Sequence, residues 1–227
     1  MGLRELKKEQ TRQLIADTAW QLFADRGFDK VSVAEVARAA QVAEATVFNY
    51  FPSKEDLFYS RLESFWTRLA DAVSARPDGQ PVLDAFRHAL LAESGLLGQL
   101  ESGDPDALTR LRTVNRIVAA SPALLAREQQ VMSRAASDLA ARLAAETGAS
   151  AADLRPQVAA NALIGVHRAL IDYVRRRVLA DDTPASLAAE VRERSTESFA
   201  LLGHGLGATR PARASPRWRR PGVQGRR

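Results

Sequence analysis

The segment from Ser32 to Lys54 limits the fold of this chain most narrowly, because its pattern predicts two short helices joined by a tight turn. Ser32 and Glu35 have the spacing of a capping box, in which the hydroxyl accepts from a free backbone N–H and the carboxylate reaches back to the cap residue. Apolar residues then recur on one helical face, at Val33, Val36, Ala37 and Ala40. Gln41 interrupts that face and predicts the turn, and a second helix is expected from about residue 44 to residue 51.

The second helix carries an unusual set of outward residues. Val47 and Phe51 form its inner face, which leaves Phe48 outside, where stability alone does not favour an aromatic ring. An apolar ring can contact a thymine methyl, an Asn can pair with adenine, and a Glu can accept from cytosine. The outer and flanking positions therefore suit the edges of base pairs, and they are Glu44, Ala45, Thr46, Phe48, Asn49 and Tyr50.

The residues after this helix predict a stop and a new start. Pro52 ends the helix, and Ser53 has the spacing of an N-cap, with Asp56 three residues later. Lys54 then lies near a helix N-terminus, where a cation and free N–H groups can together hold a phosphate.

The stretch LFADRGFDKVSVAEVARAAQVAEATVFNYFPSKEDLF, Leu22 to Phe58, resembles the DNA-binding end of the tetracycline-repressor (TetR) family of bacterial regulators. The resemblance rests on an aromatic pair, a Tyr-Phe and a Lys-Glu-Asp-Leu at fixed spacing. It implies that the recognition helix turns five residues toward the major groove: Glu44, Ala45, Thr46, Phe48 and Asn49. Ser32, Tyr50 and Lys54 are implied as phosphate contacts. Thr11 and Arg12 are candidates for the same role, with a solvated first helical turn as the alternative.

The chain departs from the family pattern at two positions. Gln41 stands where the turn usually holds Gly, and a left-handed conformation costs a non-Gly residue roughly 1 kcal/mol. Ala43 stands where the recognition helix usually has a Ser or Thr cap, which forfeits roughly 1 kcal/mol. Either departure is expected to loosen the predicted DNA-reading unit without abolishing it.

The remaining pattern predicts an all-α fold, with no strand-like alternation. Residues 1–8 are expected to form an arm, followed by a helix from about residue 9 to residue 25 that buries Leu14, Ile15 and Phe23. A helix from residue 54 to about residue 74 is expected to link the N-terminal unit to the rest. We predict a three-helix helix-turn-helix DNA-binding domain over 1–54, a larger helical ligand-binding and dimerisation domain over 55–205, and a disordered Arg-rich tail over 206–227.

The last two predicted helices, about 155–180 and 184–202, carry broad apolar faces. Such a pair can bury its surface against a second copy as a four-helix bundle, or within one chain as ordinary core. The resemblance favours the homodimer, because this family typically dimerises through its last two helices.

The net charge of +5 is misleading as a nucleic-acid signal. Seven arginines in the tail contribute +7 and leave −2 over the rest; they are Arg210, Arg213, Arg217, Arg219, Arg220, Arg226 and Arg227. DNA affinity is therefore expected from a local face around Arg4, Lys7, Lys8, Arg12 and Lys54.

Composition excludes several classes of chemistry. The chain has no cysteine, which removes disulfides, thiolate metal sites and a cysteine nucleophile. Its three histidines lie on separate segments without ligand-spaced partners, and no nucleophile elbow or phosphate-binding glycine loop is visible. We expect no metal, no cofactor and no enzymatic activity. A cytoplasmic location is expected, because no apolar run is long enough for a membrane span and the N-terminus lacks a secretory pattern.

The resemblance also implies a small-molecule pocket among the later helices. Such pockets are mostly apolar with a few polar anchors. The candidates are Phe65, Trp66, Phe86, Arg112, Asn115, Met132 and His167, and ordinary core is the alternative for each aromatic residue and for Met132. For His167 a core or dimer-interface position is the competing interpretation.

These observations predict a homodimeric, sequence-specific transcriptional regulator, a repressor that a small ligand releases from a palindromic operator. Two other functions remain open. A helical carrier of small molecules would have lost DNA recognition through its altered turn at residues 41–43. A nonspecific DNA binder would instead use the Arg-rich tail.

Overall fold

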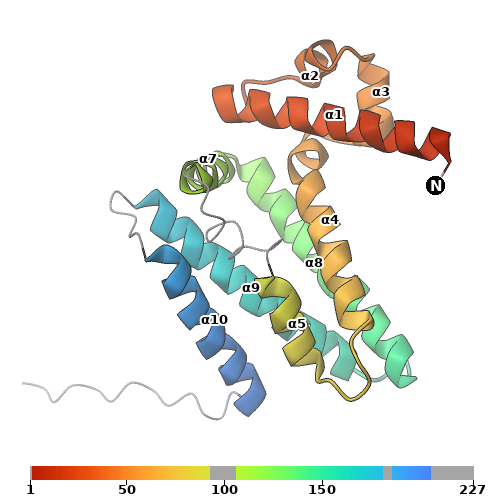
Figure 1. The fold of residues 1–227 in the computed structure, drawn as a ribbon, viewed down its shortest axis with the longest axis vertical. Coiled ribbons are helices and arrows are strands. Elements are labelled where there is room, and N and C mark those ends of the chain that lie inside the picture. The colour runs from red at the N-terminus through yellow and green to blue at the C-terminus, as the bar shows by residue number, and fades with distance from the viewer. Residues whose placement is uncertain (1, 93–105, 181–185, 206–227) are drawn as a thin grey trace, which may run out of the picture.

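The computed structural model describes residues 2–92, 106–180 and 186–205, and every regular element within these ranges is an α-helix, as expected. Three helices form an N-terminal unit, here called the head: α1 (Leu3–Arg26), α2 (Val33–Ala39) and α3 (Glu44–Tyr50). The other helices form the body: α4 (Lys54–Ser74), α5 (Val82–Leu91), α7 (Ala107–Ala120), α8 (Pro122–Thr147), α9 (Arg155–Leu179) and α10 (Leu187–His204). Figure 1 shows the head at one end of the molecule, with α4 running from it into the body.

The start of the chain differs from the expectation. The helix α1 begins at Leu3 rather than near residue 9, because Arg4, Lys7 and Lys8 are good helix formers even without an apolar stripe. Leu14, which we expected to be buried, is 52% exposed. Ile15 occupies the inward position instead, and one residue along a helix turns the side chain by about 100°.

The local signals of the head appear as predicted. Ser32 caps α2 with a complete capping box, and Ser53 caps α4 by accepting from the backbone N–H of Asp56. Gln41 has a φ of 57°, so a residue with a side chain does occupy the left-handed turn. Ala43 caps α3 without any side-chain hydrogen bond. The head therefore contains the two local weaknesses that its sequence indicates.

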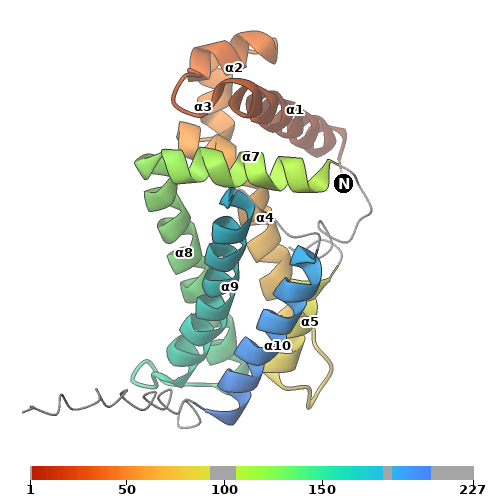
Figure 2. The ribbon, with the colours of Figure 1, turned by 90° about the vertical axis from the view of Figure 1, so that its left-hand side faces the viewer.

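The body is built around α9, which lies between α8 and α10 in Figure 2 and packs against both. On the other side α4 packs against α5 and α8, while α7 crosses between the head and the long helices. One apolar core runs from α1 through α4 to α8 and α9, and a smaller one joins Val174 and Val178 to Leu187 and Val191. The predicted Arg-rich tail lies outside the described residues.

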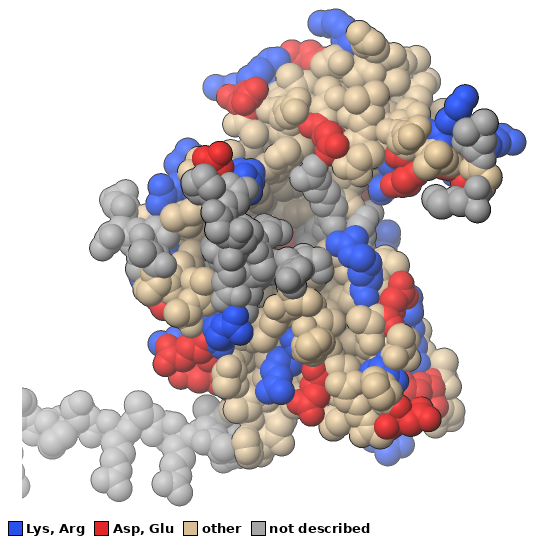
Figure 3. Space-filling model, viewed as in Figure 1, with Lys and Arg blue, Asp and Glu red and all other residues tan. Residues whose placement is uncertain are grey.

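Within the described ranges, no helix is sufficiently long and apolar to cross a membrane. Both signs of charge are mixed over the face of the body in Figure 3. Lys and Arg side chains stand out at the N-terminal end of α1, next to acidic side chains. This distribution agrees with the expectation that the body does not attract nucleic acid by its overall charge.

Candidate functional site

The helix α3 presents one exposed face, held in place by its buried side. Val47 is fully buried and Phe51 is 2% exposed, so these two side chains fix the rotation of the helix against the head core. Phe48 is 44% exposed on the opposite side. The exposed residues of this face are Glu44, Ala45, Phe48 and Asn49, and Thr46 and Tyr50 lie half-buried at its flanks. We call these four exposed residues the reading face; their contact with DNA stays a prediction.

A surface cleft of about 350 Å³ lies where the start of α1 meets the end of α3. It brings together three of the predicted residues, Arg12, Asn49 and Tyr50, with Glu5, Lys8 and Glu9. The guanidinium of Arg12 lies 5.1 Å from the centroid of the Phe51 ring, which holds its stem against the head. Thr11, the residue before Arg12, is half-buried. Its hydroxyl donates to the carbonyl of Lys7 at 2.9 Å, within its own helix.

The side chain of Ser32 forms its hydrogen bonds within the capping box of α2. Its hydroxyl donates to Oε2 of Glu35 at 2.9 Å and accepts from the backbone N–H of Glu35 at 3.2 Å. The backbone N–H of Ser32 and the guanidinium of Arg26 bond the same carboxylate, and together they lower the pKa of Glu35 to about 2. A phosphate could accept from this hydroxyl only if its single proton turned away from Glu35.

Lys54 begins α4 with its Nζ atom 4.1 Å from the centroid of the Phe28 ring. The ammonium is therefore drawn over the edge of the head core, and the side chain is half-buried. It still lies in the first turn of a helix, where backbone N–H groups are free to receive an anion. The phosphate contact of Lys54 stays a prediction.

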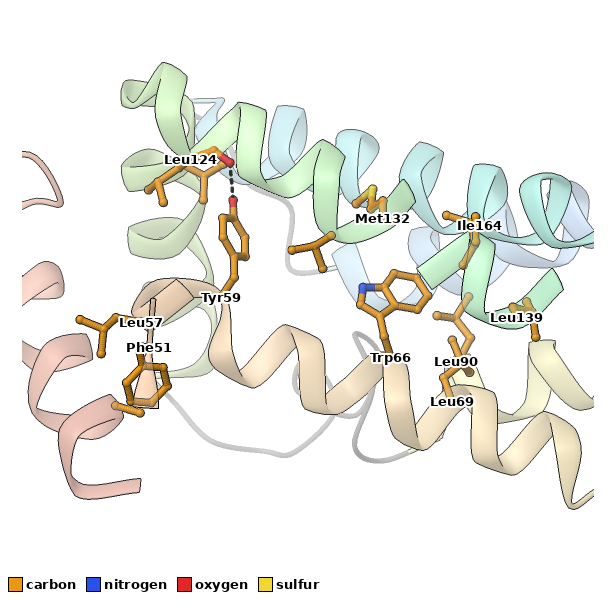
Figure 4. Close-up of a cluster of buried hydrophobic side chains, with 14 of the residues drawn as sticks. Phe51, Leu57, Tyr59, Trp66, Leu69, Leu90, Leu124, Met132, Leu139 and Ile164 are labelled. Atoms are coloured by element: carbon orange, nitrogen blue, oxygen red, sulfur yellow. Dashed lines mark hydrogen bonds between the residues drawn. The ribbon is translucent and has the colours of Figure 1, made fainter. Parts of the chain in front are cut away.

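Three contacts fasten the first turns of α4 and the loop after α1 to the start of α8, and sequence reasoning did not identify them. Asp56 of α4 forms an ion pair with Arg127 at 2.5 Å, and the hydroxyl of Tyr59 donates to the carbonyl of Leu124 at 3.1 Å. The second bond is drawn in Figure 4. Ser121 donates to Asp29 in the loop after α1 at 3.4 Å. Motion of α4 relative to α8 therefore requires that these polar contacts change.

A buried polar network lies next to these contacts between α4 and α8. Glu128 is 6% exposed and pairs with Arg175 of α9 at 2.7 Å, and Arg175 donates through Nε to the side-chain oxygen of Asn115 at 3.2 Å. Asn115 also donates to the carbonyl of Leu111, so it faces inward as expected. Burial raises the pKa of Tyr59 beyond its usual range, and the charge of Glu128 adds to this. Glu128 lies four residues after Leu124, on the same face of α8, and this spacing was the sequence signal for the network.

Three of the predicted ligand residues meet between α4 and α9. The ring of Trp66 meets the imidazole of His167 edge-on at a centroid distance of 4.7 Å, and Phe65 stacks on the imidazole at 5.8 Å. His167 is 3% exposed, and burial lowers its pKa to about 4. Met132, which is 5% exposed, belongs to the same core and lies on the side of α8 that faces Trp66 in Figure 4. We call Phe65, Trp66 and His167 the aromatic cluster.

The other ligand candidates have different surroundings. Phe86 is fully buried and packs its ring on Phe199 of α10 at 6.2 Å. Arg112 donates through Nε to the carbonyl of Val178 at 3.0 Å and so ties α7 to the end of α9. Within the described parts of the chain, no group of His, Asp and Glu side chains has the arrangement of a metal site. Ligand contact by any of these residues stays a prediction.

A head with an exposed helix-turn-helix and a separate helical body is the architecture of a DNA-binding regulator. Residues 15–60 match the family described as bacterial regulatory proteins, tetR family, and residues 80–204 match the MftR C-terminal domain. The chain belongs to the tetR family of bacterial regulatory proteins. It is a DNA-binding transcriptional regulator.

Individual relatives match over nearly their full lengths. The chain is 27% identical to the transcriptional regulator TcmR of Streptomyces glaucescens, over 98% of this chain and 92% of TcmR. It is 29% identical to the putative mycofactocin biosynthesis transcriptional regulator MftR of Mycobacterium tuberculosis, over 88% of this chain and 93% of MftR. A putative TetR-family regulator from Syntrophomonas wolfei has a similar fold, with a TM-score of 0.55 at 18% identity, over 88% of this chain and 97% of that one.

Proposed function

We propose that the protein is a homodimeric repressor that binds a pseudo-palindromic operator and is released by a small molecule bound in the body. The observation that carries the proposal is the reading face of α3. Phe48 and Asn49 are exposed there, on a helix whose rotation is fixed by the buried Val47. An exposed aromatic ring is more favourably placed in contact with a thymine methyl than in water. Acting on DNA, the protein would work in the cytoplasm.

The surface of α9 and α10 supports the dimer. Leu154 and Val158 at the start of α9 are 70% and 64% exposed, and Leu179 and Leu201 are each 38% exposed. A second copy would cover these side chains in a symmetric four-helix contact. Two heads in such a dimer can enter successive major grooves when their reading faces lie about 34 to 36 Å apart.

The proposed release depends on α4, the helix that connects the head to the body. The helix α4 is continuous from the head into the core of the body, and its first turns are fastened to α8 by Asp56 and Tyr59. A ligand that favours a different position of α4 would change the separation of the two heads. Release requires that the ligand bind the two conformations with different affinities.

Selection from a random duplex library tests the DNA-binding part of the proposal. We expect enrichment of one inverted repeat at physiological salt. Phe48→Ala and Asn49→Ala should each weaken binding to that repeat by about tenfold to a hundredfold, because a good base contact is worth roughly 1–3 kcal/mol. Leu14→Ala is the matched control, since Leu14 is equally exposed on the head but lies on α1. Unchanged operator affinity in both α3 variants would refute the proposal.

Lys54→Gln tests the phosphate contact separately. Binding to all sequences should weaken to a similar degree, and the slope of affinity against salt should fall by about one unit. Lys30→Gln is the control, because Lys30 is exposed on the head outside the predicted interface.

The two alternative functions give different results in the same selection. A small-molecule carrier enriches no sequence, and its DNA affinity stays low for every duplex. A tail-dependent binder enriches total DNA without sequence preference and loses binding when residues 208–227 are deleted. The tail lies outside the described residues, so the deletion is the direct test of its part.

A further inference from the structure

The aromatic cluster contains hydrogen-bonding groups that no described residue of the chain uses. Neither ring nitrogen of His167 has a hydrogen-bond partner among the described residues, and the Nε1 atom of Trp66 has none there either. Both side chains are more than nine-tenths buried. Buried polar groups are nearly always bonded, and leaving one unpaired is unfavourable. Phe or Leu would fill the same space without that cost. Since no described residue takes these hydrogen bonds, the two side chains are placed to offer them to a bound molecule.

The arrangement of the helices leaves this place adaptable. The helix α4 packs closely on α5 and α8, whereas it meets α9 chiefly through the rings of Phe65, Trp66 and His167. Figure 4 shows Trp66 reaching from α4 toward Met132 and Ile164, across the space between the helices. Phe65 is half-buried and connects the cluster to the surface. Rings can change rotamer and admit another ring between α4 and α9, which two tightly packed backbones cannot do.

The chemistry of the exposed bonding groups selects a class of ligand. Because burial lowers the pKa of His167 to about 4, its imidazole is neutral at pH 7 and offers one donor and one acceptor. The indole of Trp66 offers only a donor. A charged ligand group would be buried here without an opposite charge, since Glu128 and Arg175 are already paired with each other. A hydroxyl can accept from the indole N–H and donate to the imidazole at once.

We propose that Phe65, Trp66 and His167 bind an uncharged hydroxylated aromatic molecule between α4 and α9, and that this molecule is the releasing ligand. Its ring stacks within the cluster, and its hydroxyl pairs with Trp66 Nε1 and with the acceptor nitrogen of His167. Insertion of a further ring moves α4 away from α9 and so displaces the head. This inference rests on the proposed function for its regulatory consequence, but not for the binding itself.

The test compares 1-naphthol with naphthalene, which has the same rings and no hydroxyl. Affinities are measured by calorimetry on the full chain, and the indole N–H of Trp66 is followed by ¹⁵N NMR and identified by its absence in Trp66→Phe. We expect 1-naphthol to bind about tenfold more tightly than naphthalene, as one net hydrogen bond provides, and to shift the Trp66 signal. In His167→Phe the preference should fall toward unity. His88→Phe, which changes an exposed histidine, should preserve it.

Three results would overturn the inference. They are no binding of 1-naphthol up to about 1 mM, equal affinities for the two compounds in the unmodified protein, or a full preference retained in His167→Phe. Equal affinities would mean that the hydroxyl makes no net favourable contact in the cluster. The NMR signal of Trp66 gives an answer in the unmodified protein even if the variant does not fold. Operator selection separates the two proposals, because a protein that selects an inverted repeat but ignores 1-naphthol retains its function and loses only this site.

Discussion

His167 makes the stability of this protein depend on pH in a way that one substitution can remove. Burial places its pKa at about 4 in the folded chain, below the ordinary value of 6.5 that it regains on unfolding. The unfolded chain therefore binds the proton more tightly, and the free energy of unfolding falls as the pH drops from 6.5 toward 4. A difference of 2.5 pKa units corresponds to roughly 3 kcal/mol in total, all of it present above pH 6.5.

Between pH 7 and pH 5 the predicted loss from His167 alone is roughly 2 kcal/mol, because about 1.5 units of that range lie below the unfolded pKa. His167→Phe cannot take up the proton and should lose about 2 kcal/mol less than the unmodified protein over the same range. It should also be more stable at pH 7, since two unpaired buried nitrogens are removed.

Urea unfolding at pH 7 and pH 5 measures both effects, with protein concentration held constant because dimerisation adds to the apparent stability. His88→Phe is the matched control, since its exposed side chain meets solvent in both states and should leave the pH dependence as it is. An equal loss of stability between pH 7 and pH 5 in His167→Phe and in the unmodified protein would show that the imidazole is not buried in the neutral form.

The head and the contacts between α4 and α8 lead to further predictions. Gln41→Gly should stabilise the head by about 1 kcal/mol because the φ of 57° suits glycine, and a lower midpoint in thermal unfolding would contradict this. Ala43→Ser adds the missing cap of α3 and should contribute about 1 kcal/mol, measured in the same way; no gain would mean that the hydroxyl does not reach a free N–H. Asp56→Asn removes the ion pair with Arg127 that holds α4 against α8; because one position of α4 governs both events, operator affinity should fall and ligand affinity should rise, as separate DNA and ligand titrations can establish.

Much of the fold was predictable because its signals are local. Ser32 and Glu35 form the predicted capping box, α4 spans the predicted residues, and α9 ends within one residue of the expected position. Each of these features depends on residues that are three or four apart, whose contacts form whenever the backbone is helical. The turn at Gln41 followed from the break in the apolar face, and its left-handed conformation was implied by the resemblance to the TetR family.

The candidate site was predictable only in part. The outward position of Phe48 followed from helical periodicity, and its exposure confirms that placement. The burial of Asn115 also followed from its position in an apolar segment. Leu14 was wrongly placed inside, because periodicity identifies an apolar face to within about one residue and the packed neighbours decide which residue faces inward.

By itself the sequence determined that the chain is helical, the caps at Ser32 and Ser53, and the outward position of Phe48. Only the tertiary structure decided that Asp56 pairs with Arg127 and that Glu128 is buried against Arg175. It also decided that Trp66 and His167 meet with no hydrogen-bond partner for their ring nitrogens in the described part of the chain. Residues 66 and 167 stand far apart in the chain, and no local rule brings them together. Such contacts arise when long segments close and helices choose one packing among many, a choice made by the whole core rather than by any short pattern.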